Sequence, residues 1–277
     1  MNFVAADILA RLEAIGEQDD DGLDIGDTAL LLAKLDLPAN DLAAYRAELS
    51  LIAADLGAAA RGADTLPERT AALSQTLYQQ HEYQGDVKTY DDPQNANLMR
   101  VIDRRKGLPV ALGILLIHAA RSQGWRISGL NFPGHFLLRL TKSGEHAVID
   151  PFDAARRLGE GDLRQLIRRV HGRAVPLQAE FMHPVSDRSI LLRLQNNIKL
   201  RALGEGNQGR AIDILQSIIL IAPGNAELLA ELALLEAAGG HLMSALQRLD
   251  RFLQRHPEPT GAAKILSLKE RLNRNLN

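Results

Sequence analysis

The sequence predicts an α+β protein that is mostly helical, with a small antiparallel sheet in its middle and an α-solenoid tail. Three observations support this prediction: helical spacing of apolar residues over the first 80 positions, three strand-like segments between residues 125 and 150, and a 34-residue repeat near the end. The 277 residues, 46% hydrophobic and 24% charged, have the composition of an ordinary globular protein. We expect three parts, at residues 1–84, 85–180 and 188–277.

The N-terminal part is expected to form a small helical bundle that packs on the core. Apolar residues share a helical face over residues 9–15, 28–35 and 42–56. Pro67 suits the first turn of a fourth helix, which would run to about His81.

Two further helices are predicted before the sheet. Asn95 is placed to cap the first, whose basic last turn, residues 104–106, precedes Gly107. Pro109 opens the second, which is apolar on most sides over residues 110–122. A helix of that kind must lie at the centre of a domain, because it has no face suited to water.

A histidine and an aspartate are expected to face each other in a hairpin. Strands 135–140 and 145–150, joined by a four-residue loop, would place His135 directly opposite Asp150. A two-residue Ser143-Gly144 turn would shift the register by two and make the pair diagonal. Both arrangements leave the two side chains on one face of the sheet, so a contact between them is predicted from parity alone.

The tail contains an internal repeat with the period and small-residue positions of tetratricopeptide repeats. The pairs that lie 34 residues apart are Leu203 and Ala237, Gly206 and Gly240, Ala211 and Ala245, Leu215 and Leu249, and Pro223 and Pro257. We expect helix pairs at 190–203 with 208–221 and at 226–238 with 242–255, and a capping segment from residue 260. Such a stack offers a groove for a partner protein or peptide. The residues expected to line that groove are Asn197, Arg201 and Glu231.

Cysteine is absent, which excludes disulfides, thiolate metal sites and a cysteine nucleophile. No basic segment precedes an apolar run at the start, and the longest apolar run, residues 108–120, is too short to cross a bilayer. We therefore expect a cytoplasmic protein that has no membrane partner.

The net charge of −2 is unevenly distributed along the chain. Residues 1–60 hold 12 acidic and 3 basic residues, whereas the remainder holds 22 acidic and 29 basic ones. Basic residues gather within 156–173, but no aromatic residues are interleaved with them to stack on bases. Nucleic acid is therefore not an expected partner, and a contact between the basic part and the acidic N-terminus explains the pattern equally well.

A set of short motifs runs from about residue 70 to the end of the chain. They are Gly85-Asp86, Tyr90, Asp92-Pro93, Asn95, Asn97, RRKGLPVAL (104–112), NFPGHFLLR (131–139), IDPF (149–152) and LLRLQNNIK (191–199). In this combination the chain resembles the bacterial SirB-type family, which joins a transglutaminase-like, papain-related domain to tetratricopeptide repeats.

The resemblance implies the position of an active site. In active members of the wider superfamily, a cysteine at the N-terminus of the central helix is the nucleophile, a histidine is the base and an aspartate orients it. Carried onto this sequence, His135 takes the base position and Asp150 the orienting position. The nucleophile position falls within residues 109–111, at Ala111, and alanine cannot attack a substrate. The resemblance thus implies a degenerate core that keeps two members of the triad.

Three hypotheses for function follow. In the first, which we favour because the reacting group is missing, an inactive transglutaminase-like domain serves as a protein-interaction scaffold without a cofactor. In the second, His135 oriented by Asp150 acts as a general base in a hydrolase or transferase of amide bonds. In the third, His135, His146, Asp150 and Asp153 hold a metal ion. The identity of the partner and the oligomeric state are left open.

Overall fold

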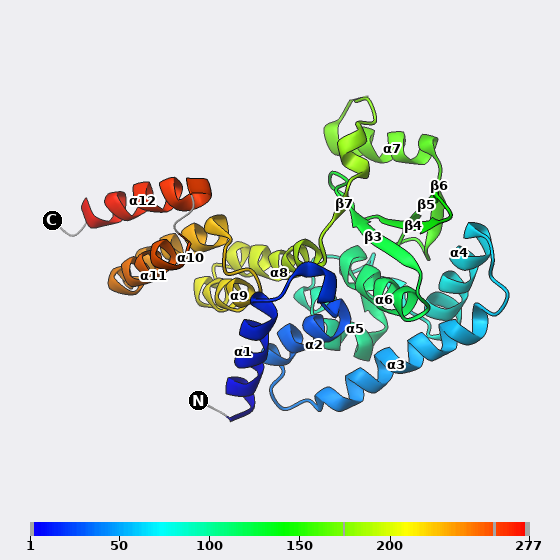
Figure 1. The fold of residues 1–277 in the computed structure, drawn as a ribbon, viewed down its shortest axis with the longest axis horizontal. Coiled ribbons are helices and arrows are strands. Elements are labelled where there is room, and N and C mark those ends of the chain that lie inside the picture. The colour runs from blue at the N-terminus through cyan, green and yellow to red at the C-terminus, as the bar shows by residue number, and fades with distance from the viewer. Residues whose placement is uncertain (1–2, 174, 257–258, 275–277) are drawn as a thin grey trace. The chain divides into compact units, whose positions relative to one another are not determined.

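The structure, a computed structural model, describes residues 3–173, 175–256 and 259–274 (Figure 1). It contains two compact units, which we call the core unit (Asp19–Leu194) and the repeat unit (Met1–Gln18 with Gln195–Asn277). Three parts were predicted, but residue 84 is not a boundary between units. The helices from residue 25 onward pack with the helices and sheet that follow residue 85, so they belong to one unit.

Helix α6 is the central helix of the core unit, as predicted. The helices of this unit are α2 (Ile25–Asp36), α3 (Leu42–Ala59), α4 (Leu66–Ser74), α5 (Leu98–Arg104), α6 (Pro109–Ser122), α7 (Glu160–His171) and the first part of α8 (Asp187–Gly204). Eleven residues of α6 are buried, and α2, α3 and β3 (Arg126–Leu130) all pack against it. Burial on every side explains why this helix has almost no polar residues.

Five strands form one antiparallel sheet, in the order β6-β5-β4-β3-β7. They are β3, β4 (Leu138–Lys142), β5 (Glu145–Asp150), β6 (Arg156–Leu158) and β7 (Pro184–Val185). The three consecutive strands β3, β4 and β5 were predicted, whereas β6 and β7 were missed. A separate parallel pair joins β1 (Gln84–Gly85) to β2 (Lys106–Gly107).

The hairpin between β4 and β5 uses the two-residue turn. Ser143 and Gly144 both have positive φ, at 50° and 85°, and Lys142 pairs with Glu145. Two consecutive positive φ angles define the type I′ turn, whose twist matches that of the flanking strands. The four-residue loop was therefore the wrong alternative, and β4 begins at Leu138, three residues after His135.

Polar side chains cap α2, α3, α4 and α5, whereas the N-cap residues of α6 and α7 offer no side-chain cap, and one cap differs from the prediction. Asn97, and not Asn95, caps α5 by accepting a hydrogen bond from the backbone N–H of Arg100 at 3.1 Å. The amide group of Asn97 also donates to the carbonyl of Ala33 at 3.2 Å, which ties α5 to α2. Asn95 is instead buried in a 3-10 turn, η3 (Pro93–Ala96).

From residue 208 onward, the described residues of the repeat unit form helices joined by short turns. They are α9 (Gln208–Ile221), α10 (Ala226–Ala238), α11 (Leu242–Arg255) and α12 (Pro259–Arg274). Ala245, Leu249 and Phe252 of α11 share one buried core with residues of α10 and α12. The segment from residue 260 therefore caps the stack as predicted, whereas Pro257, the last proline of the repeat pattern, lies outside the described residues.

Helix α1 (Phe3–Gly16) belongs to the repeat unit, although we predicted that it would join the N-terminal bundle on the core. It packs against α9, and Ile8 and Leu12 are buried. Gly16 permits this contact, because a Cβ atom there would lie 2.0 Å from the carbonyl oxygen of Leu220. None of the helices in the described residues combines the length and apolar character that a membrane-spanning segment needs.

Candidate functional site

The structure brings His135 and Asp150 together. Nε2 of His135 lies 2.9 Å from Oδ2 of Asp150, at the end of β5. The other oxygen of this buried carboxylate accepts a hydrogen bond from the backbone N–H of Phe152 at 2.8 Å. Because a carboxylate can only accept, this contact places the imidazole proton on Nε2 and leaves the lone pair on Nδ1.

The His135 ring is partly accessible, with 22% of the side chain exposed. Within the described part of the chain, Nδ1 has no hydrogen-bond partner. The His135 ring is therefore oriented by Asp150, and its role as a general base stays a prediction.

No reacting group is present at the position that the resemblance assigns to the nucleophile. Ala111 lies in the first turn of α6 and is 0% exposed, and its neighbours Pro109 and Val110 are also buried. The ring of Phe136, the residue after His135, packs on Gly113 of the same helix, where a Cβ atom would lie 2.4 Å from it. The start of α6 is thus covered by protein atoms, and the methyl group of Ala111 can neither attack a substrate nor hold a proton.

The start of α6 still carries backbone donors. The N–H of Leu108 donates to the carbonyl of Asn95 at 2.9 Å, and Leu108 offers no side-chain cap. The next two N–H groups, those of Val110 and Ala111, have no acceptor in the described residues. Unpaired N–H groups in a first helical turn are the donors that stabilise an oxyanion in acyl-transfer enzymes.

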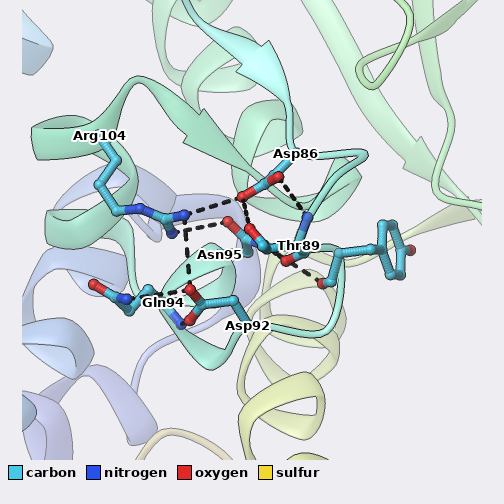
Figure 2. A network of polar contacts seen from close by, with 7 residues as sticks. Asp86, Thr89, Asp92, Gln94, Asn95 and Arg104 are labelled. Carbon is cyan, nitrogen blue, oxygen red and sulfur yellow. Dashed lines mark hydrogen bonds and ion pairs between the residues drawn. The ribbon is translucent and has the colours of Figure 1, made fainter.

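A buried carboxylate organises the loop that precedes α5 (Figure 2). Asp86 is 4% exposed, and it accepts hydrogen bonds from the backbone N–H of Thr89 at 2.9 Å and from its hydroxyl at 2.6 Å. Nη2 of Arg104 lies 3.0 Å from the same carboxylate, and Nη1 of Arg104 donates to Oδ1 of Asn95 at 3.0 Å. This network fixes residues 86–97 as one rigid loop.

The pKa of Asp86 reflects this network. Burial acts to raise it, but the hydrogen bonds from Thr89, a contact with Asn95 and the charge of Arg104 outweigh burial and lower the pKa of Asp86 to about 2. The carboxylate is therefore ionised at every physiological pH, and its charge is matched inside the loop.

Aromatic side chains connect this loop to the His135 site. Gly85 lies against the ring of Phe152, where a Cβ atom would be 2.5 Å away, and Tyr90 meets the same ring edge to face at 5.7 Å. The residue before Phe152 is held as well, because the hydroxyl of Tyr78 donates to the carbonyl of Pro151 at 2.5 Å. Burial, followed by the nearby charges of Asp150 and Asp153, raises the pKa of Tyr78 well above its usual value, so it remains a neutral donor.

Three of the quoted motifs thus meet at the ring of Phe152, namely Gly85-Asp86, Tyr90 and IDPF, and no sequence rule predicted these contacts. The RRKG segment (104–107) shows why such contacts are hard to predict from sequence. Its two arginines diverge: Arg104 joins the Asp86 network, whereas Arg105 adopts a left-handed conformation with φ of 55°. Arg105 then pairs with Glu48 and donates to the hydroxyl of Tyr83 at 2.5 Å.

The residues predicted to line the repeat groove lie on α8 and α10. Nη1 of Arg201 donates to the backbone carbonyl of Asn197 at 2.9 Å, and Glu231 forms an ion pair of 2.6 Å with Nζ of Lys199. Their role in binding a partner stays a prediction.

The four residues considered for a metal site do not come together as one set of ligands. His146 contacts the hydroxyl of Thr141, and Asp153 pairs with Arg156. Among the described residues no group of three or more histidines, aspartates or glutamates has the geometry to hold a metal ion.

Comparison with known proteins agrees with this architecture. Residues 43–196 match the model of the transglutaminase-like superfamily, and residues 198–273 match a tetratricopeptide repeat model.

Full-length relatives are bacterial. A UPF0162 protein of Xylella fastidiosa is 31% identical over 253 residues, which cover 90% of each chain. A UPF0162 protein of Pseudomonas aeruginosa is 31% identical over 197 residues, or 71% of this chain and 72% of the relative. A shorter match of 82 residues links 30% of this chain, at 35% identity, to 13% of human F-box only protein 21. The chain therefore belongs to the transglutaminase-like superfamily and, within it, to the UPF0162 family, with tetratricopeptide repeats after the transglutaminase-like domain.

Proposed function

We propose that this protein is a non-catalytic interaction scaffold of the bacterial cytoplasm, in which the transglutaminase-like domain is a pseudoenzyme and the repeats bind a partner protein in a regulatory role. The observation that carries the proposal is the full burial of the methyl group of Ala111, the residue to which the family resemblance assigns the nucleophile position. Tetratricopeptide repeats generally mediate protein-protein interactions, and this supports the binding half of the proposal. In such a domain the His135 and Asp150 pair contributes stability instead of chemistry.

The Ala111→Cys variant tests whether the vestigial site can still react. Because the chain has no cysteine, the new thiol would be the only one, and mass spectrometry would follow its alkylation by iodoacetamide without background. We expect alkylation on the order of 100-fold slower than that of a free thiol, because a thiol buried among apolar side chains is inert.

Ser50→Cys supplies the matched control, since Ser50 lies on the exposed face of α3. Rapid alkylation of Cys at position 111 at pH 6, where the control is slow, would reveal an accessible thiolate and would contradict the proposal.

Removing the imidazole should affect stability only. His135→Ala is expected to lower the free energy of unfolding by about 2 kcal/mol, because the buried Asp150 carboxylate loses its side-chain donor. Urea denaturation measures this loss, and His146→Ala, which removes an exposed histidine of β5, is the control with no expected change. A hydrolysis rate on amide substrates that disappears in His135→Ala would show that the pair is catalytic.

That outcome would favour the second candidate function, a hydrolase or transferase of amide bonds. Two observations support it: the partly exposed His135 ring with its unbonded Nδ1, and the two unpaired N–H groups at the start of α6. His135 would then remove a proton from a bound water or amine, while the N–H groups of Val110 and Ala111 received the oxyanion. This function requires the covered start of α6 to become accessible to a substrate.

A further inference from the structure

The repeat unit has a groove of about 550 Å³ on the side formed by α9, α11 and α1. Apolar side chains of α9, of the turn that follows it, of α10 and of α11 line it, namely Ile219, Leu220, Pro223, Leu229 and Phe252. This is not the surface that carries Asn197, Arg201 and Glu231, because those residues belong to α8 and α10 and none of them lines the groove. We call it the α1/α11 groove.

The two walls of the α1/α11 groove carry opposite charges. Glu13, in the last turn of α1, and Glu17, just after that helix, form one wall, and Arg251 and Arg255, one turn apart on α11, form the other. His256 extends the second wall and stacks on Phe252 at a ring separation of 4.8 Å.

These charges are not neutralised across the groove. No ion pair joins the two walls in the described residues. Arg248, which also lines the groove, is already bound to Glu236 at 2.8 Å, whereas Nε of Arg251 donates only to the carbonyl of Gln247 on its own helix at 3.4 Å. Like charges spaced four residues apart on a helix destabilise it, so an occupant that supplied acidic side chains would stabilise the α11 wall.

The secondary structure of the unit favours a helical occupant. A peptide that binds as an added strand needs the edge of a sheet, and the described residues that line this groove lie in helices or in the turns next to them. A helix satisfies its own backbone and can place apolar side chains at positions i, i+3, i+4 and i+7 on an apolar floor.

We propose that the α1/α11 groove binds an amphipathic helix of a partner protein whose apolar face is flanked by acidic side chains on one edge and basic side chains on the other. The acidic edge lies against Arg251 and Arg255, and the basic edge lies against Glu13 and Glu17. This inference rests on the proposed scaffold function and names the partner class and the surface for it.

Three synthetic peptides of about 14 residues test the proposal, each with leucine at i, i+3, i+4 and i+7. The mixed peptide has glutamate on one edge and lysine on the other, the acidic peptide has glutamate on both, and the basic peptide has lysine on both. Fluorescence anisotropy with the full chain measures each Kd. We expect the mixed peptide to bind at least about tenfold more tightly than the other two, because only it complements both walls.

Variants of the walls should change the preference in a defined way. In Arg251→Glu/Arg255→Glu both walls are acidic, so the basic peptide should bind best. In Glu13→Lys/Glu17→Lys both walls are basic, so the acidic peptide should bind best. The control Arg271→Glu/Arg274→Glu reverses two exposed charges on α12 of the same unit and should keep the wild-type order.

The proposal would be overturned if the three peptides had the same order of Kd in the wall variants as in the wild type. It would also be overturned if no peptide bound saturably. Concentration-dependent dimerisation that Arg251→Glu/Arg255→Glu abolishes would overturn it as well, since a second copy would then be the occupant. The failure of the scaffold function is separate: a reactive thiol in Ala111→Cys would refute the pseudoenzyme without changing these affinities.

Discussion

Replacing Asp86 with alanine is expected to lower the free energy of unfolding by about 3 kcal/mol, because it removes one member of a buried ion pair and leaves Arg104 without its closest carboxylate. The loop of residues 86–97 would lose the carboxylate that accepts hydrogen bonds from both the backbone N–H and the hydroxyl of Thr89. Urea denaturation measures the loss. Asp92→Asn is the control: Asp92 lies 3.7 Å from the same guanidinium, and asparagine keeps the cap at the start of η3, so a change under about 1 kcal/mol is expected.

The same carboxylate predicts a pH dependence. Its folded-state pKa is lowered to about 2 from an ordinary value of 3.8, so ionised Asp86 stabilises the folded state by about 2 kcal/mol above pH 5. This stabilisation is lost as the pH falls through 4 towards 2, and about half remains at pH 3. The difference in stability between the wild type and Asp86→Asn should therefore shrink between pH 6 and pH 3, and a constant difference would contradict the assignment.

Gly113→Val is expected to destabilise the core unit by about 3 kcal/mol or more, because the new side chain has no space between α6 and the ring of Phe136. A Cβ atom at this position would lie 2.4 Å from that ring, and the ring is buried. Valine also has a higher intrinsic helix propensity than glycine, so any loss of stability must come from the contact.

A double-mutant cycle isolates that contact. Gly113→Ala and Phe136→Leu should each destabilise the protein, but the combined variant should be more stable than the sum of the two effects predicts, by about 1 kcal/mol or more. Gly161→Ala in α7 is the control, since no atom lies within 4 Å of its would-be Cβ, and it should be neutral or slightly stabilising. Additive effects in the cycle would show that Phe136 is not what restricts position 113.

The contact between His135 and Asp150 was predicted from the sequence, by the alternation of side chains along two strands. The predicted contact is present, but His135 lies three residues before β4 begins, so strand alternation alone does not position its side chain. The turn itself could not be chosen, because Ser143 is a residue that seldom adopts positive φ, and the packing of β4 against β3 and β5 determines the register.

The patterns in the sequence did not predict contacts between residues that lie far apart along the chain. Asn95 and Asn97 are both suited to begin a helix, and only the position of Arg104 and of the Ala33 carbonyl decides which of them is the cap. Helix α1 has the same amphipathic pattern as its neighbours, yet Gly16 lets it approach α9 instead of the core. The short strands β6 and β7 have three and two residues, too few to show an alternation.

The hydrogen bond from the side-chain amide of Asn97 to α2 limits how far the chain can be shortened and still fold alone. The match to the superfamily begins at residue 43, but Asn97 donates to the carbonyl of Ala33 on α2, and His118 of α6 packs on Gly26. A polypeptide trimmed to the matched residues would lose α2, expose the apolar flank of α6 to water and leave Asn97 with a donor unsatisfied. We expect autonomous folding only in fragments that start at or before Asp24, the cap of α2.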